Sequence, residues 1–201
     1  MPRKENQDQE EIILWEMVRS NDLQAFNQIY RIHYPRLMYI GKQLHCDEET
    51  TKDLLHDTFI EIYERRASIK IRSSLKFYLI RCFKSHLHKH IRQNQEHLKV
   101  IEEEEKEIQF TFSIQQEIIQ NQSSLEQYAS IEKEINALTS RQREAMYYYF
   151  KEGFDYDEIT ELMSLKTRRS AQNLIYEAIK IIKSRLLSLL FFVGVSFKEI
   201  Y

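Results

Sequence analysis

The chain contains few of the residues that interrupt helices or cross-link a fold. Its 201 residues include only three glycines, two prolines and two cysteines. Scarce glycine and proline favour long helices over the frequent tight turns of all-β proteins. Cys46 and Cys82 lie far apart and neither has a CxxC partner. We therefore expect buried free thiols and no disulfide framework.

The chain also lacks a long apolar run. About 20 such residues are needed to span a bilayer, whereas the apolar stretch 186–197 is shorter and is interrupted by Ser188 and Gly194. The amino-terminal residues MPRKENQDQEE are polar and contain no apolar signal core. A hydrophobic fraction of 42% nevertheless supports packed cores. We expect a soluble cytoplasmic protein of one or two domains, with no direct membrane insertion.

Recognisable catalytic patterns are missing as well. The sequence has no Gly-rich phosphate loop, no GxSxG motif and no credible catalytic triad. His86 and His90 are spaced to share a helix face, but no nearby carboxylate or thiolate would complete a zinc site. His56-Asp57 resembles the HD dipeptide of metal-dependent phosphohydrolases, without the further spaced ligands of that class. We expect neither an enzyme nor a bound metal or cofactor.

Charge is segregated along the chain, although the formal net charge is only −2. Residues 64–99 contain ten Lys or Arg against two Glu, and residues 162–186 contain six against one. Between them, residues 100–134 contain two Lys against nine Glu. Two basic blocks around an acidic one indicate two nucleic-acid contacts separated by a connector.

Residues 10–95 show the apolar periodicity of packed helices and are expected to form one helical domain. Asp and Asn residues supply N-cap signals within it, and Pro35 is expected to mark a helix boundary. Helices are expected at 10–19, from the Asn21-Asp22 cap to Pro35, on to about Leu44, from Asp47 to about Arg65, and from Ser73 or Ser74 to about Arg92.

A second helical domain is expected at 123–187, after an acidic linker at 96–122 and before an apolar tail at 188–201. Thr139 begins a T-x-x-Q capping box that opens a helix, and Gly153 is expected to end that helix. The predicted fold class is therefore all-α, with two helical domains joined by an acidic linker.

Residues 155–185 have the pattern of a helix-turn-helix. Asp155 and Glu158 form a start signal for the first helix, a break at 164–166 follows, and Thr167 can cap the second helix. Apolar residues share one face of the second helix, and polar residues suited to base edges and phosphates share the other. A helical hairpin with a solvated polar face is the alternative for this segment alone. The residues expected to contact DNA are Lys166, Thr167, Arg168, Arg169, Gln172, Asn173 and Tyr176.

The expected basic helix at 75–92 interleaves aromatic and cationic residues. Cations follow a phosphate backbone, and aromatic faces stack on the bases of a separated strand, so we expect contact with melted DNA. Most apolar positions, such as Phe77 and Phe83, are interpreted as core. The residues expected to contact DNA, including the loop before the helix, are Arg72, Lys76, Arg81, Lys84, Ser85, Lys89 and Arg92.

Both domains resemble an alternative sigma factor of the extracytoplasmic-function group, the minimal two-domain form of the bacterial sigma-seventy type. The resemblance covers region two of that family at 10–95 and region four within 123–187. The matching segments are LQAFNQIY at 23–30, DLLHDTF at 53–59, the basic helix from Leu79 to Arg92, LTSRQR at 138–143 and EITEL at 158–162.

The resemblance implies a non-enzymatic initiation factor that binds core RNA polymerase. Region four would bind the minus-thirty-five element of promoter DNA, and region two would open the minus-ten element. Asp53, His56 and Asp57 would contact polymerase. The resemblance also implies an anti-sigma partner, which in this family is frequently anchored in the membrane.

Two other functional classes stay open at this point. A helix-turn-helix regulator would bind duplex DNA without polymerase, and its basic amino-terminal domain would serve dimerisation or nonspecific binding. A metal phosphohydrolase would bind a divalent metal tightly and depend on His56. Duplex binding by the isolated chain and metal analysis of the purified protein would distinguish these two classes from an initiation factor.

Overall fold

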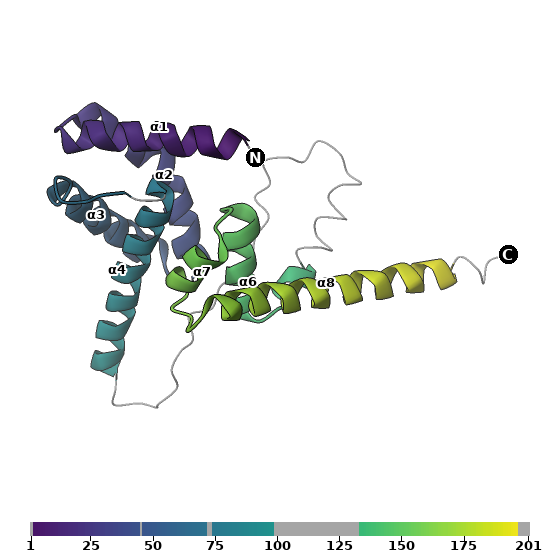
Figure 1. The fold of residues 1–201 in the computed structure, drawn as a ribbon. Coiled ribbons are helices and arrows are strands. Elements are labelled where there is room, and N and C mark those ends of the chain that lie inside the picture. The colour runs from purple at the N-terminus through teal and green to yellow at the C-terminus, as the bar shows by residue number, and fades with distance from the viewer. Residues whose placement is uncertain (1, 45, 72–73, 99–132, 197–201) are drawn as a thin grey trace. The chain divides into compact units, whose positions relative to one another are not determined.

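The computed structural model describes residues 2–44, 46–71, 74–98 and 133–196 (Figure 1). All the secondary structure in these ranges is helical and no strand occurs in them, so the all-α prediction is confirmed. The chain divides into two compact units, Met1–Glu107 and Ile108–Tyr201. The finer boundaries of the acidic linker stay a prediction, because most of 96–122 lies outside the described residues.

The described residues of the amino-terminal unit form four helices: α1 (Pro2–Arg19), α2 (Leu23–Gln43), α3 (Glu48–Glu64) and α4 (Leu75–Leu98). Consecutive helices pack on one another, and α4 also contacts α1 and α2 (Figure 1). Helix α1 begins at Pro2 rather than near residue 10, and proline is well suited to a first helical position because its missing N–H has no intrahelical partner there. The large side chains buried in this core include Trp15, Ile29, Leu37, Ile40, Leu55, Phe59, Leu75, Leu79, Ile80 and Phe83.

The starts of three helices follow the N-cap signals in the sequence. The Asp22 carboxylate accepts hydrogen bonds from the Gln24 and Ala25 amides, at 2.8 and 3.1 Å. The Asp47 carboxylate accepts one from the Thr50 amide at 2.8 Å. Ser74, rather than Ser73, precedes α4, and its Oγ accepts from a backbone amide at 3.5 Å. These caps satisfy amides that have no intrahelical partner.

The expected helix boundary at Pro35 is wrong, because α2 continues through it. An internal proline removes one backbone hydrogen bond and costs about 3 kcal/mol or more. Ile29 on one side of it and Leu37 and Ile40 on the other are at most 1% exposed. Burying such side chains stabilises the fold by about 1.5–3 kcal/mol each, so the packing of an unbroken α2 outweighs the local cost.

Helices α2 and α3 approach closely at Gly41. A Cβ atom there would overlap the Thr51 methyl group and lie 3.1 Å from Phe83 Cζ. We expect Gly41→Ala to destabilise the amino-terminal unit, because overpacking costs about 1–3 kcal/mol and the gain in helix propensity returns only about 1 kcal/mol. Urea unfolding followed by the fluorescence of Trp15, the single tryptophan, would measure this. Thr51→Ser removes the obstructing methyl group and should restore part of the loss; a Gly41→Ala variant as stable as the parent would contradict the packing argument.

The carboxy-terminal unit contains α6 (Ser140–Met146), the π-helical turn η1 (Tyr147–Lys151), α7 (Tyr156–Leu162) and α8 (Arg168–Ser196). Helix α8 packs against both α6 and α7. The Thr139 capping box is present at α6, and Gly153 lies at φ 69° just beyond η1. The sequence predicts that a helix begins after Thr139 and ends at Gly153, but it does not predict that the helix becomes π-helical at Tyr147–Lys151. The backbone of the apolar tail is helical through Ser196.

Among the described residues, no helix combines the length and the apolar character needed to cross a membrane.

Candidate nucleic-acid interface

The second helix of the helix-turn-helix presents its polar face to solvent. Ala171, Ile175 and Ala178 are buried at no more than 2% exposure and anchor the opposite face of α8. The burial of these small and β-branched residues, spaced three or four apart, determines which side of α8 faces outward. The residues predicted to contact DNA on α8 are all exposed: Arg168, Arg169, Gln172, Asn173 and Tyr176.

The turn before α8 presents the two remaining residues of the predicted set. Lys166 and Thr167 are exposed, and Thr167 Oγ1 accepts a hydrogen bond from the Ser170 amide at 3.2 Å. Thr167 therefore caps α8 as predicted. Ser164, at φ 50°, provides the left-handed residue that reverses the chain after α7.

A groove of about 580 Å³ lies beside this turn, between α6 and α8. Lys166 and Asn173 line it together with Arg141 of α6. Arg141 is exposed and its Nη2 donates to the Met163 carbonyl at 3.4 Å. Sequence reasoning did not select Arg141, although its position two residues after the Thr139 cap marks it as the first cation of α6.

Arg168 is held by residues of the preceding helix, a feature that the sequence did not reveal. Its Nη1 donates to Asp157 Oδ2 at 2.9 Å, and its guanidinium lies 5.7 Å from the centre of the Tyr156 ring. Tyr156 in turn stacks on Tyr149 of η1, with ring centres 5.3 Å apart and planes 16° apart. A hydrogen bond with Tyr149 raises the pKa of Tyr156, with a smaller contribution from burial.

Helix α4 carries the predicted basic surface of the amino-terminal unit. Arg81, Ser85, Lys89 and Arg92 are exposed at helical spacing and form one stripe; we call these four residues the α4 stripe. Lys76 is half-buried near the start of the helix. The four residues of the stripe face solvent as a DNA-contacting surface requires.

One residue predicted for the α4 surface, Lys84, does not join this stripe. Lys84 is only 5% exposed, because at its position α4 faces the other helices. A long cationic side chain that is this deeply buried does not reach a phosphate, so we leave Lys84 out of the proposed surface. Arg72 lies outside the described residues.

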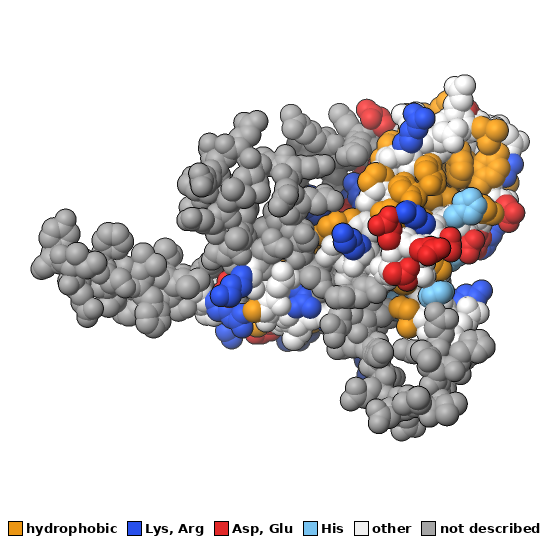
Figure 2. Space-filling model, turned by 180° about the vertical axis from the view of Figure 1, so that it is seen from behind, with side chains coloured by type: hydrophobic (Ala, Val, Ile, Leu, Met, Phe, Trp, Pro, Cys, Tyr) orange, Lys and Arg blue, Asp and Glu red, His pale blue; other side chains and the backbone are white. Residues whose placement is uncertain are grey.

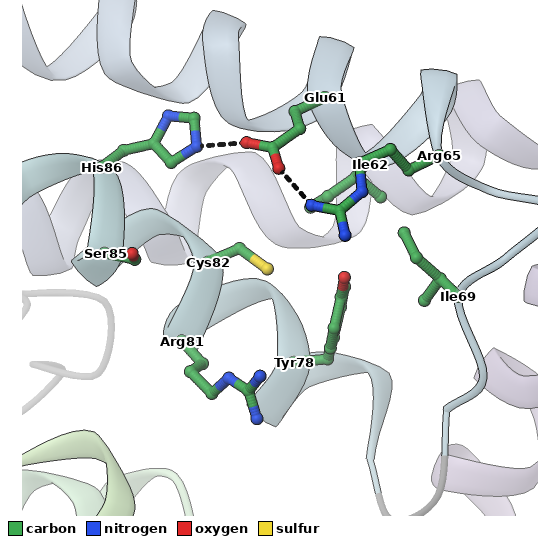
Figure 3. A pocket seen from close by; sticks show the side chains of 9 residues that line it. All are labelled: Glu61, Ile62, Arg65, Ile69, Tyr78, Arg81, Cys82, Ser85 and His86. Atoms are coloured by element: carbon green, nitrogen blue, oxygen red, sulfur yellow. Dashed lines mark hydrogen bonds and ion pairs between the residues drawn. The ribbon is translucent and has the colours of Figure 1, made fainter.

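A cavity of about 210 Å³ lies between α3 and α4, next to the stripe (Figure 3). Glu61 lies between His86 and Arg65 at its rim: one carboxylate oxygen is hydrogen-bonded with His86 Nε2 at 2.7 Å, and the other accepts from Arg65 Nη1 at 2.6 Å. The Tyr78 and Cys82 side chains point into the space beside them (Figure 3). Arg81 and Ser85 of the stripe also line this cavity.

The titrating groups of the cavity have shifted pKa values. Hydrogen bonds from Arg65 and then His86 lower the pKa of Glu61. Burial raises the pKa of Tyr78 to about 12 and also raises the pKa of Cys82. At neutral pH the rim therefore carries an ionised carboxylate, while the phenol and the thiol keep their protons and can donate hydrogen bonds.

The residues predicted to contact polymerase lie on the outer face of α3. Asp53, His56 and Asp57 are all exposed. His56 follows Asp53 by three residues, and Asp57 is the next residue. Leu54 and Leu55 are buried on the other side. Figure 2 shows acidic side chains beside a gathering of hydrophobic ones on one face of this unit. The large exposed hydrophobic residues of the unit are Ile13, Met17, Leu23, Ile32 and Ile60.

The candidate metal ligands do not converge. Within the described ranges, no three or more His, Cys, Asp or Glu side chains are placed to hold a metal ion. His86, one of the i,i+4 pair, is instead bonded to Glu61. His56 and Asp57 are exposed on α3.

Comparison with known proteins gives a family match and structural likenesses. Residues 29–97 match the model of sigma-70 region 2. The fold is similar to RpoE of Bartonella quintana, crystallised with the anti-sigma factor NepR: TM-score 0.57, 18% identity, 82% of this chain and 98% of that chain. It is also similar to CnrH, crystallised with the cytosolic domain of CnrY: TM-score 0.54, 15% identity, 88% of this chain and 96% of that chain. At these identities the likeness concerns the fold. No curated protein sequence matches the chain.

Proposed function

We propose that this chain, whose residues 29–97 match the model of sigma-70 region 2, is a sigma factor of the extracytoplasmic-function group that directs core RNA polymerase to promoters. The observation that carries this proposal is the pairing of that domain with two exposed cationic helix faces, one on α4 and one on α8, in separate units. Two such faces on one chain suit two separate elements of a promoter.

Helix α8 reads the minus-thirty-five element in this proposal. Arg168, Arg169, Gln172 and Asn173 reach base edges in the major groove, where guanidinium groups recognise guanine and amides recognise adenine. Lys166 and Thr167, in the turn, lie against phosphates, and Tyr176 packs against the sugar-phosphate backbone of the DNA. The exposure of all seven residues supports this assignment.

The amino-terminal unit captures the opened minus-ten element. The α4 stripe follows the phosphates of the separated strand, with Lys76 near the start of α4. An unstacked base enters the cavity between α3 and α4, where the Tyr78 phenol offers a hydrogen bond and an aromatic face. The cavity supports this step because the stripe residues Arg81 and Ser85 line it.

The outer face of α3 contacts core polymerase through Asp53, His56 and Asp57. We propose that the chain also has an anti-sigma partner, as RpoE of Bartonella quintana does in its complex with NepR. Polymerase and promoter DNA place the protein in the cytoplasm, and the chemistry of RNA synthesis is supplied by polymerase.

Mixing the purified chain with core polymerase and mapping the resulting transcripts tests this function. We expect a stable complex and discrete start sites that core polymerase alone does not use. Failure to associate with polymerase would overturn the proposal. If the chain instead binds a duplex tightly by itself at physiological salt, it acts as a polymerase-independent regulator.

Lys89→Ala is expected to weaken capture of the opened strand without changing which promoters are chosen. A phosphate contact releases counterions, so its loss should reduce the slope of log affinity against log salt concentration by about 1. Titration of the polymerase complex with promoter DNA at several salt concentrations measures this slope. Lys42→Ala removes the same charge from an exposed position on α2 and should leave the slope unchanged. An unchanged slope in Lys89→Ala would remove Lys89 from the surface.

A further inference from the structure

Two side chains of α7 contact the guanidinium of Arg168. Asp157 of α7 accepts from its Nη1 at 2.9 Å. The ring of Tyr156, also of α7, has its centre 5.7 Å from the guanidinium, and Tyr149 of η1 stacks on Tyr156 with ring centres 5.3 Å apart. The predicted base-reading residue at the start of α8 therefore does not project freely from its helix.

The first turn of α7 is itself rigid. Asp155 accepts hydrogen bonds from the Asp157 and Glu158 amides at 2.8 and 2.9 Å, and the Glu158 carboxylate accepts one from the Asp155 amide at 3.0 Å. This capping box fixes the backbone on both sides of Tyr156. The position of Asp157 relative to Arg168 is thus set by backbone geometry rather than by a flexible loop.

The ion pair between Arg168 and Asp157 contributes little to the folding stability of the carboxy-terminal unit. The Arg168 and Asp157 side chains are 57% and 63% exposed, and exposed ion pairs contribute little to folding. Restricting the orientation of the Arg168 guanidinium affects base recognition instead. An arginine recognises guanine through two parallel hydrogen bonds, which require a defined orientation of its planar fork.

We propose that Asp157 and Tyr156 are positioning residues that set the base specificity of Arg168. This inference rests on the proposed function of α8. Asp157 holds one guanidinium nitrogen, the Tyr156 ring holds its plane, and the carboxylate repels a phosphate that would otherwise compete for the cation. Arg168 is thereby reserved for a base that offers two acceptors, as guanine does through O6 and N7.

The test uses the polymerase complex and a duplex promoter library randomised across the upstream element. Arg168→Ala identifies the base pair that Arg168 reads, as the position where discrimination disappears. Asp157→Ala and Tyr156→Leu should lower discrimination at that same position by about fivefold or more, since a bidentate contact is the source of the preference. Discrimination at the other positions should stay as in the parent chain.

A comparison of single and double variants distinguishes a loss of Arg168 positioning from a general disturbance of the fold. In an Arg168→Ala background, Asp157→Ala should have no further effect on base preference, because the side chain that it positions is gone. Glu177→Gln removes one negative charge from the exposed side of α8. It should raise affinity for all sequences alike and leave the preference at the Arg168 position intact.

The possible failures are distinguishable. If Arg168→Ala changes no base preference, the proposed role of α8 is wrong. If Arg168→Ala abolishes a preference that Asp157→Ala and Tyr156→Leu both leave unchanged, only the positioning inference is overturned. A third outcome is that Asp157→Ala lowers discrimination equally at every position of the promoter, both alone and combined with Arg168→Ala. That result would show a disturbed fold and would overturn the positioning inference as well.

Discussion

Replacing Arg168 and Arg169 together by alanine is expected to lower promoter-directed initiation by about 30-fold or more. Each base-reading arginine contributes about 1–3 kcal/mol, and about 1.4 kcal/mol corresponds to a factor of ten. Both side chains are exposed at the start of α8, so their loss leaves the core of the unit intact. Run-off transcription with core polymerase on a selected promoter measures the effect.

A control on the same helix keeps this experiment interpretable. Lys180 and Lys183 are exposed further along α8, and replacing both by alanine removes the same number of charges. That variant should retain its promoter choice and lose only part of its nonspecific affinity. Initiation at the parental level after loss of Arg168 and Arg169 would contradict the assignment of α8 to promoter reading.

Phe83→Ala is expected to destabilise the amino-terminal unit by about 3–5 kcal/mol, the usual cost of removing a buried phenyl ring. Phe83 is 0% exposed and lies where α4 meets the contact of α2 with α3 at Gly41. Domains of this size are typically stable by only about 5–15 kcal/mol, so the variant should approach unfolding. Urea denaturation followed by Trp15 fluorescence reports on this unit alone, since Trp15 is the single tryptophan.

Ile60→Ala provides the matched comparison. Ile60 is 43% exposed on α3, so its truncation leaves no enclosed cavity and should cost far less than truncation of Phe83. We also expect Phe83→Ala to lose initiation near its unfolding temperature, although Phe83 touches neither DNA nor polymerase in the proposal. A Phe83→Ala variant as stable as Ile60→Ala would show that the core is arranged differently.

The motifs at 23–30 and 53–59 predict a sigma-type region two, and residues 29–97 match the model of sigma-70 region 2. That match does not extend to α8, and the roles of individual residues there stay predictions. The capping signals at Asp22, Asp47, Thr139 and Asp155 were read correctly. Each involves side chains and amides within three residues of one another, and such interactions do not depend on the rest of the fold.

Pro35 and Lys84 depart from their sequence predictions because segments distant in the chain determine their surroundings. Pro35 was expected to break a helix, but burial of α2 against its neighbours outweighs the local cost. Lys84 was grouped with the exposed cations of α4, yet its position on the helix faces the core. Charge and spacing along one helix identify a stripe, but its edges depend on which neighbouring helices pack against it.

Helix starts, the exposed polar face of α8 and the basic character of α4 follow from residues within a few positions of each other, because capping and amphipathic periodicity act over one or two turns. The cavity between α3 and α4 and the contacts of Asp157 and Tyr156 with Arg168 join residues separated by whole elements. Their geometry depends on how helices pack. Only the tertiary structure could therefore show which cations are buried, which are held by neighbouring side chains and which are exposed.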